Sequence, residues 1–157
     1  SEVALWRQGL VRWRNETKNQ SVDVPEALLE TGLRKELQMS GGGIVELLRV
    51  TAQLHSELDE QGDLNGEEEA KRLFLLARAY KELPGYFMYE LPEMLLERAI
   101  RLQNNTEVAQ RSFLLYKEII IGAYSGSGGT YLPSDVEALL RELEGLAYGI
   151  PNLSGRV

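Results

Sequence analysis

Tyrosine and arginine side chains in the second half of the sequence are the residues best suited to recognition chemistry. Tyrosine buries a large apolar area and keeps a hydroxyl group for hydrogen bonding, which explains its enrichment at protein interfaces. We therefore predict a partner-binding groove lined by these residues: Arg72, Tyr80, Tyr86, Tyr89, Arg98, Tyr116, Tyr124 and Tyr131. The alternative is that the same aromatic rings only pack helices against one another.

The glycine-rich stretch AYSGSGGTYLPSD, which begins at Ala123, is a candidate phosphate-binding loop. A nucleotide P-loop has Gly, four residues and Gly-Lys-Ser/Thr between a strand and a helix. This stretch lacks the lysine and that spacing, and the segment before it has the apolar periodicity of a helix. We therefore predict a turn between two helices, with Ser134 capping the second one. Because Tyr124 and Tyr131 flank the turn, we expect it at an open end of the fold, where it can contact a ligand.

The acidic stretch DEQGDLNGEEE, from Asp59, has the composition of a calcium-binding loop but not its register. With Gly62 at the glycine position, a glutamine and a leucine weaken the ligand set. With Gly66 at that position instead, Arg72 stands where a bidentate carboxylate must be. We therefore predict a solvated helix start and no metal site.

The residue types also argue against most catalytic chemistry. His55 is the only histidine in 157 residues, and there is no cysteine. A multi-histidine metal site, thiolate chemistry and iron–sulfur clusters are thereby excluded within one chain. Catalysis by a carboxylate pair stays open because glutamates are plentiful, but their spacing selects no pair. We predict no catalytic residue and no cofactor.

The composition and charge limit the class of partner. The chain is 43% hydrophobic and 26% charged, which is typical of a folded domain, and its formal charge of −7 disfavours binding to nucleic acid. No apolar run is long enough to span a bilayer, so we predict no membrane insertion. The first residue is serine rather than methionine, which we interpret as a hint of a removed leader. We favour a bacterial periplasm or cell envelope, with the cytoplasm as the next alternative.

The elements that must position these residues are helices, because apolar residues recur at helical spacing and strand alternation is nearly absent. Pro25 marks one helix start, Asn65 caps another helix, and the three glycines at 41–43 end the helix that begins at Pro25. The segment 107–124 is apolar on two sides, which places it at the centre of the fold. The other predicted apolar faces are Leu28, Leu29, Leu33 and Leu37; Ile44, Leu47, Leu48, Thr51, Leu54 and Leu58; Leu73, Ala77 and Tyr80; Met94, Leu95, Ala99 and Leu102; and Val136, Leu139, Leu140, Leu143 and Leu146.

We predict about seven helices in antiparallel pairs, forming one all-α domain over residues 1–157. Residues Asn152 to Val157 are expected to be a loose tail.

The window RLFLLARAYKELPGYFMYELPEMLLERAIRL, at residues 72–102, has a further pattern. Leu73 and Ala77 lie in its first helix, a glycine–tyrosine pair lies near its turn, and Ala99 lies late in its second helix. In these features it resembles a tetratricopeptide repeat, although the stretch before Ala99 is a few residues longer and Pro92 restarts the second helix. The resemblance implies a short right-handed solenoid of stacked helical hairpins that binds a partner on a concave surface. A plain helical bundle is the alternative.

These features together predict a non-enzymatic scaffold module that binds a protein or a peptide in the tyrosine-lined groove. Two alternatives stay open. One is an enzyme that uses carboxylates in the same groove. The other is a self-associating structural subunit, such as a homodimer, because a short stack of helices leaves apolar end faces.

Overall fold

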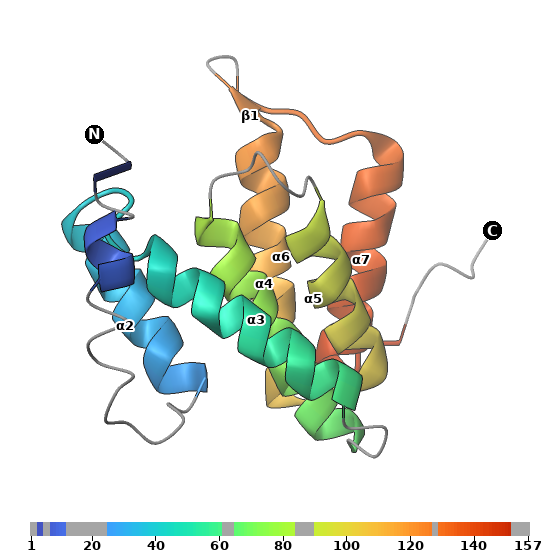
Figure 1. Cartoon of the computed structure of the whole chain (residues 1–157). Coiled ribbons are helices and arrows are strands. Elements are labelled where there is room, and N and C mark those ends of the chain that lie inside the picture. The colour runs from blue at the N-terminus through green and yellow to red at the C-terminus, as the bar shows by residue number, and fades with distance from the viewer. Residues whose placement is uncertain are drawn as a thin grey trace. The chain divides into compact units, whose positions relative to one another are not determined.

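The computed structural model describes residues 3–4, 7–11, 25–60, 65–83, 90–126 and 129–151, and the long elements among them are helices (Figure 1). These helices are α2 (Pro25–Gln38), α3 (Ile44–Glu60), α4 (Gly66–Glu82), α5 (Leu91–Leu102), α6 (Glu107–Ala123) and α7 (Ser134–Tyr148). Residues 3–4 and 7–11 are helical as well, and two short strands, β1 (Ser125–Gly126) and β2 (Gly129–Thr130), precede α7. The predicted all-α class is confirmed. No helix in the described ranges is both long and apolar enough to cross a membrane.

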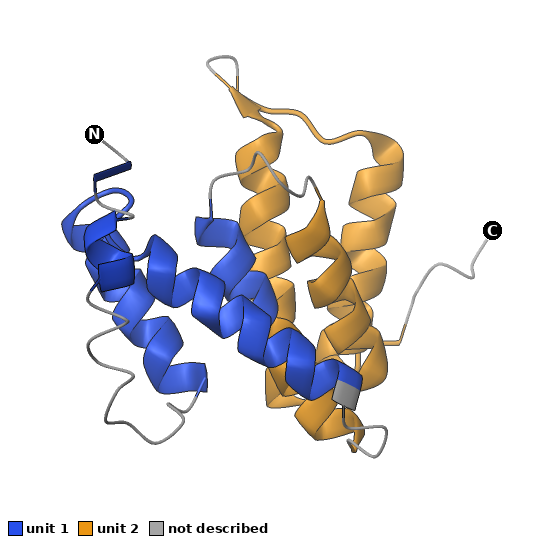
Figure 2. Ribbon diagram, viewed as in Figure 1, with its two compact units in different colours: residues 1–62, 75–89 blue, residues 63–74, 90–157 orange. Residues whose placement is uncertain are grey.

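The chain divides into two compact units (Figure 2). Unit 1 contains residues 1–62 and 75–89, and unit 2 contains residues 63–74 and 90–157. Helix α4 therefore contributes its first half to unit 2 and its second half to unit 1. This division does not test the predicted single domain, which stays a prediction, and the predicted tail, Asn152 to Val157, lies outside the described residues.

Unit 1 is built on a hairpin of α2 and α3. Helix α2 begins at Pro25 as predicted, because the fixed φ angle of proline suits a first helical turn and its missing N–H is not needed there. The helix ends before the three glycines, of which Gly41 has a φ of 80° that favours glycine. The Glu36 carboxylate accepts hydrogen bonds from the N–H groups of Gly41 and Gly43, at 2.7 and 3.1 Å. One side chain thus holds the turn against the last turn of α2.

The turn before α3 approaches α2 closely where two glycines meet. A Cβ atom on Gly43 would lie 2.0 Å from the Gly32 carbonyl oxygen, so a larger residue does not fit. Leu29 and Leu47, on the two helices, have no exposed surface. This contact decides which faces of α2 and α3 are buried.

An ion pair crosses the same hairpin. Lys35 of α2 pairs with Glu46 of α3, and the Glu46 side chain is only 6% exposed. The second carboxylate oxygen of Glu46 is buried and has no hydrogen-bond partner. Because a buried carboxylate is costly unless its charge is paired, the contact between Lys35 and Glu46 matters for the stability of the hairpin. The apolar spacing of the sequence did not reveal this pair.

Two of the predicted core positions in unit 1 are wrong, because Leu37 is 90% exposed and Leu48 is exposed as well. Leu37 lies five residues after Gly32, which is about 140° around the helix axis, so the close contact at Gly32 turns it towards solvent. Leu48 lies about 100° from Leu47 and about 160° from Val50, and both of these residues are fully buried.

Helix α4 is buried on more than one side. Ala77 and Ala79 lie about 160° apart around its axis, yet neither has exposed surface. The helix begins as predicted, because the side-chain oxygen of Asn65 accepts a hydrogen bond from the N–H of Glu68 at 2.9 Å. No residue from Leu73 to Tyr80 is exposed, whereas the segment 107–124, which was predicted to be surrounded by other helices, exposes Leu114 and Ile121.

Unit 2 packs α5, α6 and α7 against one another. Helices α5 and α6 are joined by residues 103–106 and run antiparallel, as a connection of this length requires. The N–H of Asn105 donates to the carbonyl oxygen of Leu146 at 2.9 Å, which holds the last turn of α7 beside this connection. The first turn of α5, the last turn of α6 and the first turn of α7 therefore lie towards the opposite end of unit 2 (Figure 1).

Helix α6 has one buried face instead of the predicted two. Phe113 and Tyr116 are buried, whereas Leu114 and Ile121 are exposed. Leu114 lies about 100° from Phe113 and about 160° from Tyr116, so it points away from the side that α5 and α7 cover. The predicted stripe of α5 is corrected in the same way: Leu96, Ala99 and Ile100 are buried, and Met94 and Leu102 are exposed.

The predicted turn between α6 and α7 is a short β-hairpin. Ser125 pairs with Thr130 in antiparallel register, and Gly129 takes a φ of 108°. The predicted cap is wrong, because α7 begins at Ser134 itself. Pro133 occupies the cap position, and no side-chain hydrogen bond caps the helix.

Candidate partner-binding surface

The structure does not test the predicted groove as a whole. Tyr86 and Tyr89 lie outside the described residues, and Tyr80 belongs to unit 1. The remaining five belong to unit 2: Arg72, Arg98, Tyr116, Tyr124 and Tyr131. A groove that contains all eight residues therefore stays a prediction.

Tyr80 takes part in a polar contact within unit 1. Its hydroxyl shares a hydrogen bond of 2.8 Å with Nε2 of His55, and the two rings meet edge to face at 5.9 Å. Burial raises the pKa of Tyr80, and a hydrogen bond with Thr51 partly offsets this effect. This hydroxyl is already engaged by the protein, so Tyr80 contributes to packing. The contact joins residues 25 positions apart, and no local sequence signal predicts it.

The two predicted arginine anchors are also engaged by their own chain. Arg72 donates a hydrogen bond to the backbone carbonyl oxygen of Glu68 at 3.3 Å. Arg98 of α5 forms an ion pair with Glu69 of α4, within unit 2, although its side chain remains 67% exposed. The Arg72 contact lies within α4, and the Arg98 contact joins α5 to α4.

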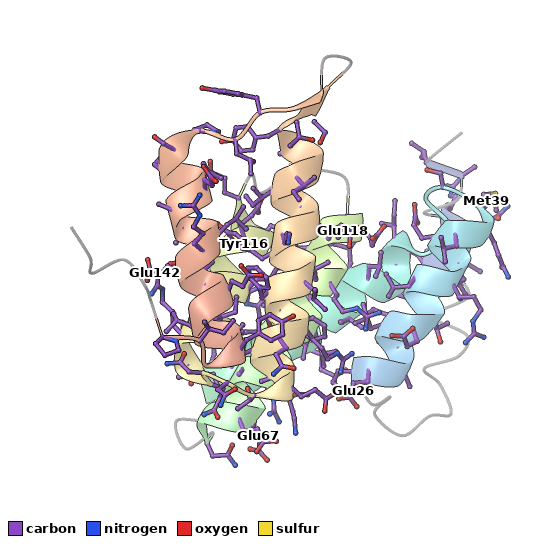
Figure 3. The ribbon with its side chains drawn as sticks, turned by 180° about the vertical axis from the view of Figure 1, so that it is seen from behind. Glu26, Met39, Glu67, Tyr116, Glu118 and Glu142 are labelled. Carbon is purple, nitrogen blue, oxygen red and sulfur yellow. The ribbon has the colours of Figure 1, made fainter. Side chains whose placement is uncertain are left out.

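Tyr116 is a buried tyrosine with acidic neighbours. Burial raises the pKa of Tyr116, and the carboxylates of Glu97 and Glu93 raise it further, while Arg101 lowers it slightly. Tyr124 also contributes to this increase, which places the two tyrosines near each other. Figure 3 shows Tyr116 on the side of α6 that faces α7, with Glu118 on the opposite side of the helix. Tyr116 is therefore part of the buried core of unit 2.

Tyr124 and Tyr131 are exposed at the base of the β-hairpin. Tyr131 is 81% exposed and Tyr124 is 39% exposed, next to the exposed Ile121 of α6. The N–H of Tyr131 donates to the carbonyl oxygen of Tyr124 at 3.3 Å, which joins the two residues through the backbone. We call these three residues, Ile121, Tyr124 and Tyr131, the hairpin-base surface.

Side-chain hydrogen bonds hold this surface in place. The hydroxyl of Ser125 donates to the Ile121 carbonyl oxygen at 2.6 Å, and it lies 2.8 Å from the Thr130 hydroxyl. The first bond ties the hairpin to the last turn of α6, and the second joins its two strands. Hydrogen bonds therefore hold the backbone on both sides of the two aromatic residues.

The described residues contain no group of three His, Asp or Glu side chains that could hold a metal ion. Residues 61–64 of the acidic turn lie outside the described ranges, so the calcium-loop argument rests on the sequence alone. Comparisons with protein-family models, with curated proteins and with solved structures return no significant match to this chain. The tetratricopeptide resemblance therefore stays a prediction, and a functional conclusion must rest on the geometry above.

Proposed function

We propose that this chain is a non-enzymatic module that binds a protein or peptide segment at the hairpin-base surface. One observation carries the proposal: Tyr131 exposes most of its ring although its backbone is hydrogen-bonded to Tyr124. A large aromatic side chain on an ordered backbone loses little conformational freedom on binding, which favours affinity. This proposal keeps two tyrosines of the predicted groove and does not use the other six residues.

The exposed area is large enough to matter for affinity. Covering the free parts of Tyr124 and Tyr131 would remove roughly 200 Å² of largely apolar surface from water, which contributes about 5 kcal/mol before the entropy losses of association. The net gain is smaller, so a short peptide is expected to bind in the micromolar range, with a Kd on the order of 10 μM.

Two carboxylates of unit 2 are used in a structural pair with one arginine. Arg101 donates hydrogen bonds to Glu97 at 2.8 Å and to Glu142 at 2.7 Å, and these bonds raise the pKa of the arginine. Arg101 and its two partners thus join α5 to α7, which is a structural role. This observation favours binding over catalysis in unit 2.

The proposal is tested with a displayed library of random peptides selected on the complete chain. Selected peptides are then measured by fluorescence anisotropy against the wild type and against Tyr124→Ser/Tyr131→Ser. We expect the double variant to bind at least about 10-fold more weakly, because two central aromatic contacts are lost. Circular dichroism checks that the variant stays helical.

A matched control replaces another exposed apolar residue outside this surface. Leu37→Ser, on α2, changes a side chain that is 90% exposed, and it should leave the affinity unchanged. Peptides that bind the double variant as tightly as the wild type, or that lose affinity only in Leu37→Ser, would contradict the proposal.

A further inference from the structure

Three acidic side chains at the hairpin end of unit 2 have no ion-pair partner among the described residues. Elsewhere in unit 2, five glutamates pair with arginines: Glu69 with Arg98, Glu97 and Glu142 with Arg101, Glu107 with Arg111, and Glu137 with Arg141. At the end that carries the hairpin, Glu90 at the cap of α5, Glu93 in its first turn and Asp135 in the first turn of α7 have no ion pair among the described residues. Three carboxylates without an ion pair therefore lie at the same end of unit 2 as the exposed tyrosines.

The end of α6 adds to this negative potential. Its last turn carries no basic residue, although the C-terminal carbonyl groups of a helix favour a nearby cation. The nearest lysine of α6, Lys117, lies over the Phe113 ring at 5.9 Å from its centroid. On α7 the nearest arginine, Arg141, is paired with Glu137. Burial is the main reason for the raised pKa of the neighbouring Tyr116, and Glu97 and then Glu93 add to it.

A surface of exposed tyrosine rings with unpaired carboxylates around it matches one side chain particularly well. The planar guanidinium of arginine stacks on aromatic rings and attracts carboxylates at the same time. An acidic peptide or a phosphate backbone would instead be repelled. A neutral apolar peptide would cover the rings but leave the carboxylates unpaired.

We infer that the partner of the hairpin-base surface is a peptide segment in which an arginine stands beside an apolar residue. The arginine lies against Tyr124 and Tyr131, and its charge is attracted by the carboxylates of the first turns of α5 and α7. The apolar neighbour covers Ile121. This inference rests on the proposed function and specifies the chemistry of the partner.

The test uses four sublibraries of random peptides that differ only at one fixed position, which is arginine, lysine, glutamine or glutamate. Each is selected on the complete wild-type chain and on Tyr124→Ser/Tyr131→Ser. We expect the arginine sublibrary to yield binders at least about 10-fold tighter than the glutamine sublibrary, with glutamate the weakest. If no sublibrary binds in a tyrosine-dependent way, the proposed function fails. If the glutamine or glutamate peptides bind as well as the arginine peptides and still need the tyrosines, the proposed function stands and the inference fails.

A second measurement isolates the carboxylates. The variant Glu90→Gln/Glu93→Gln/Asp135→Asn should weaken the best arginine peptide about 5- to 10-fold and leave its glutamine analogue unchanged. The control Glu26→Gln/Asp59→Asn/Glu144→Gln changes the net charge equally at exposed positions elsewhere and should have little effect. Equal weakening by both triple variants would show only an effect of net charge and would overturn the inference.

Discussion

The substitution Gly43→Ala tests the closest contact in the fold. The added Cβ would lie 2.0 Å from the Gly32 carbonyl oxygen, whereas real Cβ atoms essentially never approach within 3.0 Å of another heavy atom. Both groups belong to the backbone, so no side-chain rotation relieves the overlap. Helices α2 and α3 must therefore separate by about 1 Å, which also loosens the contact of Leu29 with Leu47.

The expected effect lies at the upper end of the range for overpacking. We expect the free energy of unfolding to fall by about 3 kcal/mol and Tm to fall by roughly 6–12 °C. Urea denaturation followed by far-UV circular dichroism measures the first quantity, and a thermal scan measures the second.

The same substitution at Gly122 provides a matched control of opposite sign. Gly122 lies within α6, and a Cβ atom there would meet nothing within 4 Å. Because glycine is a poor helix former, Gly122→Ala should raise the free energy of unfolding by about 0.5 kcal/mol. The reasoning is refuted if Gly43→Ala unfolds at the urea concentration of the wild type, or if the two variants shift in the same direction by similar amounts.

Three further predictions concern stability. Lys35→Met removes the partner of the buried Glu46 carboxylate and should lower the free energy of unfolding by about 3–5 kcal/mol, as measured by urea denaturation. Adding Glu46→Leu should restore most of this loss. A double variant as unstable as Lys35→Met would contradict this account. Asn65→Ala removes the N-terminal cap of α4 and should lower the free energy of unfolding by about 1 kcal/mol, whereas an unchanged value would mean that the cap is not formed. The raised pKa of Tyr116 means that the folded state holds the phenol proton more tightly than the unfolded state, so stability should fall as pH rises above about 10 and through the raised pKa. Tyr116→Phe should flatten this decline in a series of denaturation curves at increasing pH, and an equally steep decline would argue against it.

Helix boundaries could be predicted where the signal lies within one turn. Proline at Pro25, a capping side chain at Asn65 and glycines at 41–43 act through their own backbone angles and hydrogen bonds, and the structure confirms all three. The cap predicted at Ser134 is wrong because α7 begins one residue earlier than predicted. Pro133 takes the cap position, and Ser134 is the first residue of the helix.

Buried faces were less predictable, because they depend on contacts between helices. Periodicity identifies an apolar stripe but not which edge of it meets the neighbouring helix. Leu37 was predicted to be buried and is exposed, because the contact between Gly32 and Gly43 sets the rotation of α2. The same limit explains why α4, with many small and charged residues, was not identified as the helix buried on several sides.

For the candidate site, the sequence predicted the residue types better than it predicted where they lie. Tyr124 and Tyr131 flank a glycine-rich stretch, so their place at the base of a turn could be read from the sequence, although the strands of the hairpin could not. The contacts of Tyr80 with His55 and of Arg98 with Glu69 join residues from different helices. These contacts depend on how the helices pack, so local sequence patterns do not predict them.

Amide hydrogen exchange with and without the best selected arginine peptide tests the central claim, that the hairpin-base surface is where a partner binds. We expect exchange to slow at residues 124–126 and 129–132 and at the last turn of α6, with little change in α2 and α3. Protection confined to other parts of the chain, with unchanged exchange at Tyr124 and Tyr131, would contradict the claim.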